Sequence, residues 1–163
     1  MRILIYASDK YLHLIKLQSI FLNKYWPNQE IVVLCYNRPQ NEKELPENFE
    51  IVSLGKAPID KGQNRENKYW TNGLIQYFAT QKNHEFLFLL EDHLLIDYID
   101  IDEINNLHKC AKENHAVKII LSSELMPALK NKPEFLDENI IKVPSDWKYK
   151  ISVGPAIWQM NYF

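Results

Sequence analysis

Short apolar runs without polar alternation are the feature that most constrains how this chain can fold. The runs at 31–36 (IVVLCY) and 86–90 (FLFLL) are apolar throughout, as expected of strands covered on both faces of a mostly parallel sheet. Shorter or less strict runs extend the series at 3–6, 51–54 and 117–121. Parallel strands need crossover connections, which are usually helices. The pattern therefore predicts an α/β fold, a three-layer sandwich with a mainly parallel central sheet.

Helical periodicity between these runs supplies the crossovers. Within residues 11–26, four apolar side chains recur on one face that we expect to face the core: Leu14, Leu17, Phe21 and Tyr25. A second helix is predicted by the spacing of Trp70, Leu74, Tyr77 and Phe78. Asp100 and Glu103 have capping-box spacing before a third helix. Its inward residues are predicted to be Ile101, Ile104, Leu107 and Ala111. Short β-like runs follow at 140–143 and 151–153.

The bulk composition limits the classes of partner. A length of 163 residues with 46% hydrophobic side chains predicts a single domain, 1–163, whose core needs no disulfide or structural metal. A net charge of -2 gives no broad positive field for nucleic acid or an anionic membrane. Cys35 and Cys110 do not form a disulfide framework or a metal knuckle. No apolar stretch reaches the ~18 residues of a membrane span, so we expect a cytoplasmic protein.

Polar residues collect where the predicted strands end. They follow the first, second and fourth strands: Ser8 and Asp9, then Asn37, then Glu91, Asp92 and His93. In open α/β sheets, ligands bind outside the carboxyl ends of the strands. Since parallel strands end on the same side, we expect Ser8, Asp9, Asn37 and Glu91 to open onto one cleft.

Glu91, Asp92 and His93 combine two carboxylates and an imidazole directly after the most apolar run. Hard oxygen ligands with one nitrogen suit Mn²⁺ or Mg²⁺ bridging a diphosphate, and do not resemble a closed zinc site. We therefore predict a metal site at these three residues. Purely structural roles remain open for these three side chains: Glu91 and Asp92 can form an ordinary turn, and His93 can donate to a backbone carbonyl. Ser8 and Asp9 can likewise act as helix caps.

The run FLFLLEDHLLID (86–97) resembles the segment of GT-A-type glycosyltransferases in which an apolar strand ends in a D-x-D, E-D-D or D-x-H motif. Further segments extend the resemblance in the same order: SDKY before a helix, YWTNGL at the start of another, and ISVGPAIWQMNYF near the end. The resemblance implies a GT-A/Rossmann-like fold that binds a nucleotide diphosphate-sugar through Mn²⁺ or Mg²⁺ for transfer to an acceptor. We expect the cleft to hold the base and ribose, which makes Ser8, Asp9, Asn37, Glu91 and Asp92 the predicted nucleotide-binding residues. The resemblance adds Trp70 to this set and implies a donor-sugar loop containing Gly154 and Trp158.

Two departures from the family pattern limit what the resemblance implies. His93 stands where many relatives have an aspartate and others an aromatic residue that does not bind metal. The carboxylate that often acts as general base in the family would follow Phe163, so no catalytic residue is assigned. Trp70 and Trp158 also fit roles as core anchors. Two other functions stay open, namely a non-catalytic nucleotide-sugar-binding module and a metal-dependent phosphohydrolase that uses the same acidic triplet.

Overall fold

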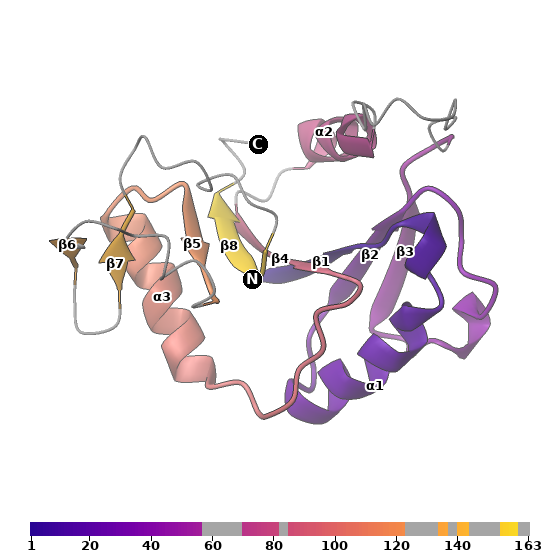
Figure 1. Cartoon of the computed structure of the whole chain (residues 1–163), viewed down its shortest axis with the longest axis horizontal. Coiled ribbons are helices and arrows are strands. Elements are labelled where there is room, and N and C mark those ends of the chain that lie inside the picture. The colour runs from indigo at the N-terminus through magenta and orange to yellow at the C-terminus, as the bar shows by residue number, and fades with distance from the viewer. Residues whose placement is uncertain (57–69, 82–84, 123–133, 137–139, 144–153, 160–163) are drawn as a thin grey trace.

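The computed structural model describes residues 1–56, 70–81, 85–122, 134–136, 140–143 and 154–159 (Figure 1). Its helices are α1 (Leu14–Tyr25), α2 (Trp70–Thr80) and α3 (Ile101–Glu113), with short 3-10 helices η1 (Asp9–Tyr11) and η2 (Glu42–Glu44). Its strands are β1 (Arg2–Tyr6), β2 (Ile31–Cys35), β3 (Phe49–Ser53), β4 (Glu85–Leu90), β5 (Lys118–Ile120), β6 (Glu134–Phe135), β7 (Ile141–Lys142) and β8 (Ala156–Gln159). The β-like run predicted at 151–153 lies outside the described residues. None of the described helices is long and apolar enough to cross a membrane.

Six strands form the central sheet in the order β3-β2-β1-β4-β8-β5. β1 pairs in parallel with β2 and β4, and β2 pairs in parallel with β3. β8 runs antiparallel between β4 and β5. The apolar runs of β1, β2 and β4 are almost wholly buried, because helices cover both faces of the sheet. The predicted α/β fold with a mainly parallel central sheet is confirmed, and the β3-β2-β1-β4 part has the Rossmann-like strand order.

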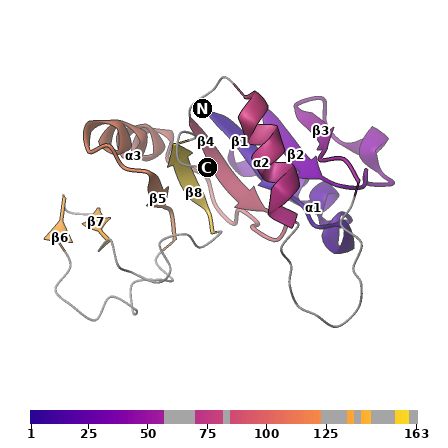
Figure 2. The ribbon, with the colours of Figure 1, turned by 90° about the horizontal axis from the view of Figure 1, so that it is seen from above.

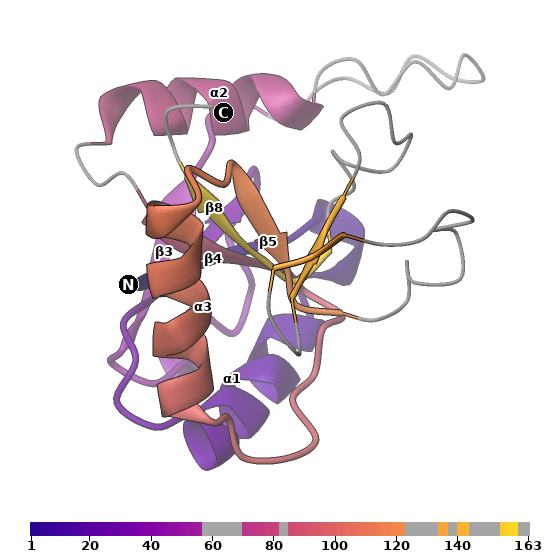
Figure 3. The same cartoon turned by 90° about the vertical axis from the view of Figure 1, so that its left-hand side faces the viewer.

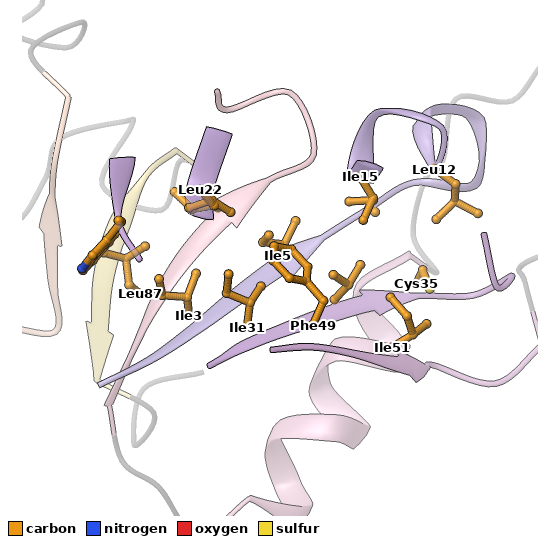
Figure 4. Packing of buried hydrophobic residues seen from close by; sticks show 14 of the residues in the cluster. Ile3, Ile5, Leu12, Ile15, Leu22, Ile31, Cys35, Phe49, Ile51 and Leu87 are labelled. Atoms are coloured by element: carbon orange, nitrogen blue, oxygen red, sulfur yellow. The ribbon is translucent and has the colours of Figure 1, made fainter. Parts of the chain in front are cut away.

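Helices on the two faces of the sheet give three layers. α2 lies across one face, and α1 lies on the opposite side (Figures 1, 2 and 3). Side chains alternate along β1: Ile3 and Ile5 belong to the core on the α1 side (Figure 4), whereas Leu4 and Tyr6 belong to the core on the α2 side. This alternation means that each β-strand anchors both outer layers at once.

The core-facing side of α1 differs from the predicted one. The buried residues are Ile15, Gln18, Ser19 and Leu22, whereas Leu17 of the predicted face is 41% exposed. Apolar residues occur nearly all around this helix, and the true inner face carries two polar side chains. The Gln18 amide bonds to backbone carbonyls outside the helix, and the Ser19 hydroxyl donates to the Lys16 carbonyl. These bonds permit burial, and periodicity of apolar residues cannot reveal them.

The start of α3 follows the prediction at its cap and departs from it one residue later. The Asp100 carboxylate accepts a 3.0 Å hydrogen bond from the Glu103 backbone N–H, so the predicted N-cap is confirmed. Ile104 and Leu107 pack against the α1-side core, and Ala111 is buried. Ile101 was predicted to point inward, which is wrong: it is 53% exposed.

A polar clamp joins α3 to the start of β4. The Glu85 carboxylate contacts the His108 ring and lies 3.3 Å from the Lys112 ammonium, and it accepts from the Gln159 amide at 3.4 Å. Burial by itself would raise the pKa of Glu85, but the hydrogen bonds and charges of His108 and Lys112 outweigh it and lower that pKa. The clamp therefore stabilises the folded protein when Glu85 is ionised.

We expect Glu85→Gln to destabilise the protein by roughly 1–2 kcal/mol at neutral pH. Because the folded-state pKa is lowered, this contribution is present above the ordinary value of 4.5 and is lost as the pH falls through the lowered value. Urea unfolding of both proteins across this acidic range measures the difference. Glu113→Gln is the control, because its pair with Lys109 is exposed and contributes little. A difference that stays constant with pH would contradict the ionised clamp.

Candidate functional site

A buried carboxylate joins the carboxyl ends of β1 and β4. Tyr6 pairs with Leu90 at the last position of the two strands, so Ser8 and Glu91 leave the sheet side by side. Glu91 is only 6% exposed. Its Oε1 accepts from the Ser8 hydroxyl at 2.8 Å and from the Ser8 backbone N–H at 3.3 Å. Ser8 precedes η1 but makes no side-chain cap bond, because its hydroxyl is turned to Glu91.

A second pair of hydrogen bonds joins the ends of β1 and β2. The Asp9 carboxylate accepts from the Asn37 backbone N–H at 2.9 Å and from the Asn37 side-chain amide at 2.7 Å. Asp9 and Asn37 are both exposed. The structure thus brings together four of the predicted residues, Ser8, Asp9, Asn37 and Glu91, which we call the strand-end cluster. The cluster spans the adjacent strands β2, β1 and β4.

The position of the cluster in the sheet is significant. From β1 the chain proceeds outward to β2 and β3 on one side, while β4 lies on the other side of β1. The order therefore reverses between β1 and β4. In open α/β sheets, the loops that leave the strands diverge at such a point and leave room for a ligand. Ser8 and Glu91 lie at this reversal.

Asp92 and His93 complete a tight turn after β4. The His93 backbone N–H donates to the Leu90 carbonyl at 3.1 Å, and the His93 Nδ1 accepts from the Leu90 backbone N–H at 2.9 Å. The Asp92 side chain is 68% exposed, and its Oδ1 lies 4.0 Å from the His93 Nε2. Glu91 and Asp92 occupy the two central positions of the turn, so one carboxylate is buried beside Ser8 and the next faces solvent.

The bond to Leu90 determines which nitrogen of His93 carries the proton. Since Nδ1 accepts, the neutral ring has its proton on Nε2. Coordination of a metal through Nε2 would require the proton to move to Nδ1, where it would face the Leu90 N–H; metal-binding histidines instead donate their second N–H to an acceptor. His93 therefore fits a role in closing the turn better than the predicted role of third ligand. The metal site at Glu91 and Asp92 remains a prediction.

Among the described residues, no group of three or more His, Cys, Asp or Glu side chains lies close enough to hold one metal ion.

The pKa of Tyr6, at the end of β1, is affected by the carboxylates of the strand-end cluster. Burial raises the pKa of Tyr6 to about 12, and Tyr36, Glu91 and Asp9 add to the shift. The carboxylates that oppose ionisation of Tyr6 would attract a cation.

Tyr36 also joins the end of β2 to α2. Its hydroxyl accepts from the Gly73 backbone N–H at 3.3 Å. A Cβ on Gly73 would lie 2.8 Å from both the Tyr36 hydroxyl oxygen and the Leu54 Cβ, so this close approach requires glycine. Trp70 is the first residue of α2, but its side chain lies outside the described part of the chain, and its predicted contact with nucleotide stays a prediction.

The predicted donor-sugar loop is only partly at the site. β8 is antiparallel to β4, with Ala156 opposite Phe88 and Trp158 opposite Phe86, so Gly154 lies toward the carboxyl end of β4. Trp158 lies toward the other end and is 6% exposed in the core on the α2 side. Five residues of extended strand, about 16 Å, separate its level from that of Glu91. The expectation that Trp158 lies in a loop at the site is wrong, whereas its alternative role as a core anchor agrees with its position.

Comparisons with known proteins identify no family. No family model matches the sequence, and no curated protein matches it. Among solved structures, the bifunctional IspDF from Campylobacter jejuni is similar with a TM-score of 0.40 and 13% sequence identity. The match covers 99% of this chain but 41% of that structure, so the chain spans less than half of its length. A similarity of this size carries no argument about function.

The Ser8–Glu91 link predicts strong energetic coupling. We expect Ser8→Ala and Glu91→Gln to be non-additive in unfolding free energy, with a coupling of about 1 kcal/mol or more, because Ser8→Ala removes the hydroxyl donor of this bond and Glu91→Gln removes the charge that strengthens it. Urea unfolding of the wild type, both single variants and the double variant gives the coupling. The matched cycle Asp9→Ala with Asn37→Ala should couple less, since both side chains are exposed. Additive effects of Ser8→Ala and Glu91→Gln would show that the link contributes nothing.

Proposed function

We propose that this chain binds a nucleotide diphosphate-sugar through Mn²⁺ or Mg²⁺ at the strand-end cluster and Asp92, and that it transfers the sugar to an acceptor. The observation that carries the proposal is the link between Ser8 and the buried Glu91, which fixes a carboxylate at the reversal of strand order. The resemblance of residues 86–97 to the acidic segment of GT-A-type glycosyltransferases supplies the substrate class.

The nucleoside would lie along the ends of β1 and β2. Asp9 holds both the backbone N–H and the side-chain amide nitrogen of Asn37. The Asn37 amide oxygen makes no hydrogen bond to a described residue and is suited to accept one from a base or a ribose hydroxyl. A network that is already hydrogen-bonded before the ligand arrives costs little ordering on binding.

The diphosphate would lie near the end of β4, held through the cation. Within the described residues, neither Glu91 nor Asp92 pairs with a lysine or arginine. A carboxylate that is buried without a cationic partner is costly, and a divalent cation removes that cost. When bound, the cation would neutralise the charge that develops on the diphosphate leaving group. The cation would lie between the buried carboxylate of Glu91 and the exposed carboxylate of Asp92.

We expect affinity for a nucleoside diphosphate to require the divalent cation and to depend on Asp92. A thermal-shift screen of nucleotide sugars with and without Mn²⁺ first identifies the base, because a ligand at 100 times its Kd stabilises the fold by about 2.7 kcal/mol. Calorimetric titration of the matching nucleoside diphosphate follows, with metal present and then chelated. Asp92→Asn should weaken metal-dependent binding roughly tenfold or more.

Asp97→Asn is the matched control, because Asp97 is an exposed aspartate in the same loop whose carboxylate accepts from the next backbone N–H, that of Tyr98, and lies outside the strand-end cluster. Equal affinity with and without metal would remove the metal site, and unchanged affinity in Asp92→Asn would remove the motif. Donor binding without transfer or hydrolysis would select the binding-module alternative. Release of inorganic phosphate from simple esters would select the phosphohydrolase.

A further inference from the structure

Gln18 is a buried polar residue on the inner face of α1. Its side chain is fully buried, at 0% exposure. The amide nitrogen donates to the Leu90 carbonyl at 2.9 Å and to the His93 carbonyl at 3.1 Å. The amide oxygen is buried and has no hydrogen-bond partner among the described residues. A single side chain of α1 thus holds both ends of the turn that carries Glu91 and Asp92.

The bonds that fix this turn come from residues other than the two carboxylates. His93 closes it twice, through its backbone N–H to the Leu90 carbonyl and through its Nδ1 from the Leu90 N–H. Gln18 then fastens the two carbonyls to α1. The direction in which Asp92 leaves the turn is therefore fixed by Gln18 and His93, because the Asp92 side chain is exposed and, within the described part of the chain, its one charged contact is the His93 ring at 4.0 Å.

The unpaired amide oxygen of Gln18 bears on whether this residue mainly stabilises the fold or mainly fixes the turn. A buried acceptor without a donor is unfavourable, so an apolar side chain of similar size would remove one defect while it loses the two donated bonds. The opposing effects reduce the net contribution of Gln18 to folding. Its specific effect is on the geometry of the turn.

We propose that Gln18 is a positioning residue, which acts with His93 to hold Glu91 and Asp92 in the orientation that binds the cation and diphosphate. The effect on the turn can be tested in the protein without ligand. The consequence for affinity rests on the proposed function above. Outer residues that orient metal-binding side chains typically change metal affinity by 10–100-fold when they are replaced.

The turn is tested first, by NMR without metal or nucleotide. Long-range ¹H–¹⁵N correlation of the His93 ring identifies which nitrogen carries the proton, and amide exchange reports on residues 90–93. In the wild type we expect a single tautomer with the proton on Nε2 and protected Leu90 and His93 amides. Gln18→Met should lose this signature while it stays folded. Ser19→Ala is the matched control, because Ser19 is buried on the same helix and its hydroxyl donates to the Lys16 carbonyl of that helix rather than to the turn after β4.

Affinity is tested second, by calorimetry of a nucleoside diphosphate with Mg²⁺. Gln18→Met should weaken binding roughly 10–100-fold, with Ser19→Ala unchanged. If Gln18→Met does not fold, Gln18→Asn keeps the amide but shortens its reach, and the same losses are expected. Wild-type signatures in the folded Gln18 variant, or equal changes in Ser19→Ala, would overturn the positioning role. If the NMR result is as expected but the wild type binds no nucleotide, the proposed function is removed. The role of Gln18 in fixing the turn after β4 then still stands.

Discussion

The hydrogen bonds from Ser8 to the buried Glu91 are the interaction on which the proposed site depends. They form because β1 and β4 are parallel neighbours in register, so two chain segments 83 residues apart end side by side. The carboxylate is taken out of water, and its donors among the described residues, the Ser8 hydroxyl and backbone N–H, are neutral. Burial of an ionised carboxylate among neutral donors costs free energy, and the proposed cation would reduce that cost. The parallel pairing of the apolar strands β1 and β4 therefore places Ser8 and Glu91 next to each other.

The rest of the structure keeps this carboxylate in place. Asp9 extends the polar connection from the end of β1 to Asn37, which follows β2, and Tyr36 connects the end of β2 with Gly73 of α2. On the other face, Gln18 of α1 holds the turn after β4. Each outer layer of the sandwich therefore reaches the strand ends through at least one hydrogen bond. The site residues themselves lie just beyond the strands, so these bonds to the packed elements are what fix their geometry.

Sequence patterns were sufficient for the parallel part of the sheet and for part of the site. Continuous apolar runs identified the buried parallel strands, and parallel direction alone implied that Ser8, Asn37 and Glu91 share an edge. The inner face of α1 was predicted wrongly, because Gln18 and Ser19 are buried by bonds that hydrophobic periodicity does not encode. The position of Trp158 was predicted wrongly because its strand, β8 (AIWQ), is short and antiparallel to the neighbouring strands β4 and β5. The tautomer of His93 depends on a bond to its own turn, which no residue pattern specifies.

The most direct test of the central claim is to locate the cation. Paramagnetic Mn²⁺ broadens the NMR signals of nearby nuclei, so titration of the ¹⁵N-labelled protein with Mn²⁺ and a nucleoside diphosphate maps the metal onto the sequence. The account predicts that broadening begins at the amides of Ser8, Asp9 and Glu91–His93 and that Asp92→Asn suppresses it. Broadening centred elsewhere, such as at the exposed first turn of α3 with Asp102 and Glu103, or undiminished in Asp92→Asn, would contradict a cation site at the ends of β1 and β4.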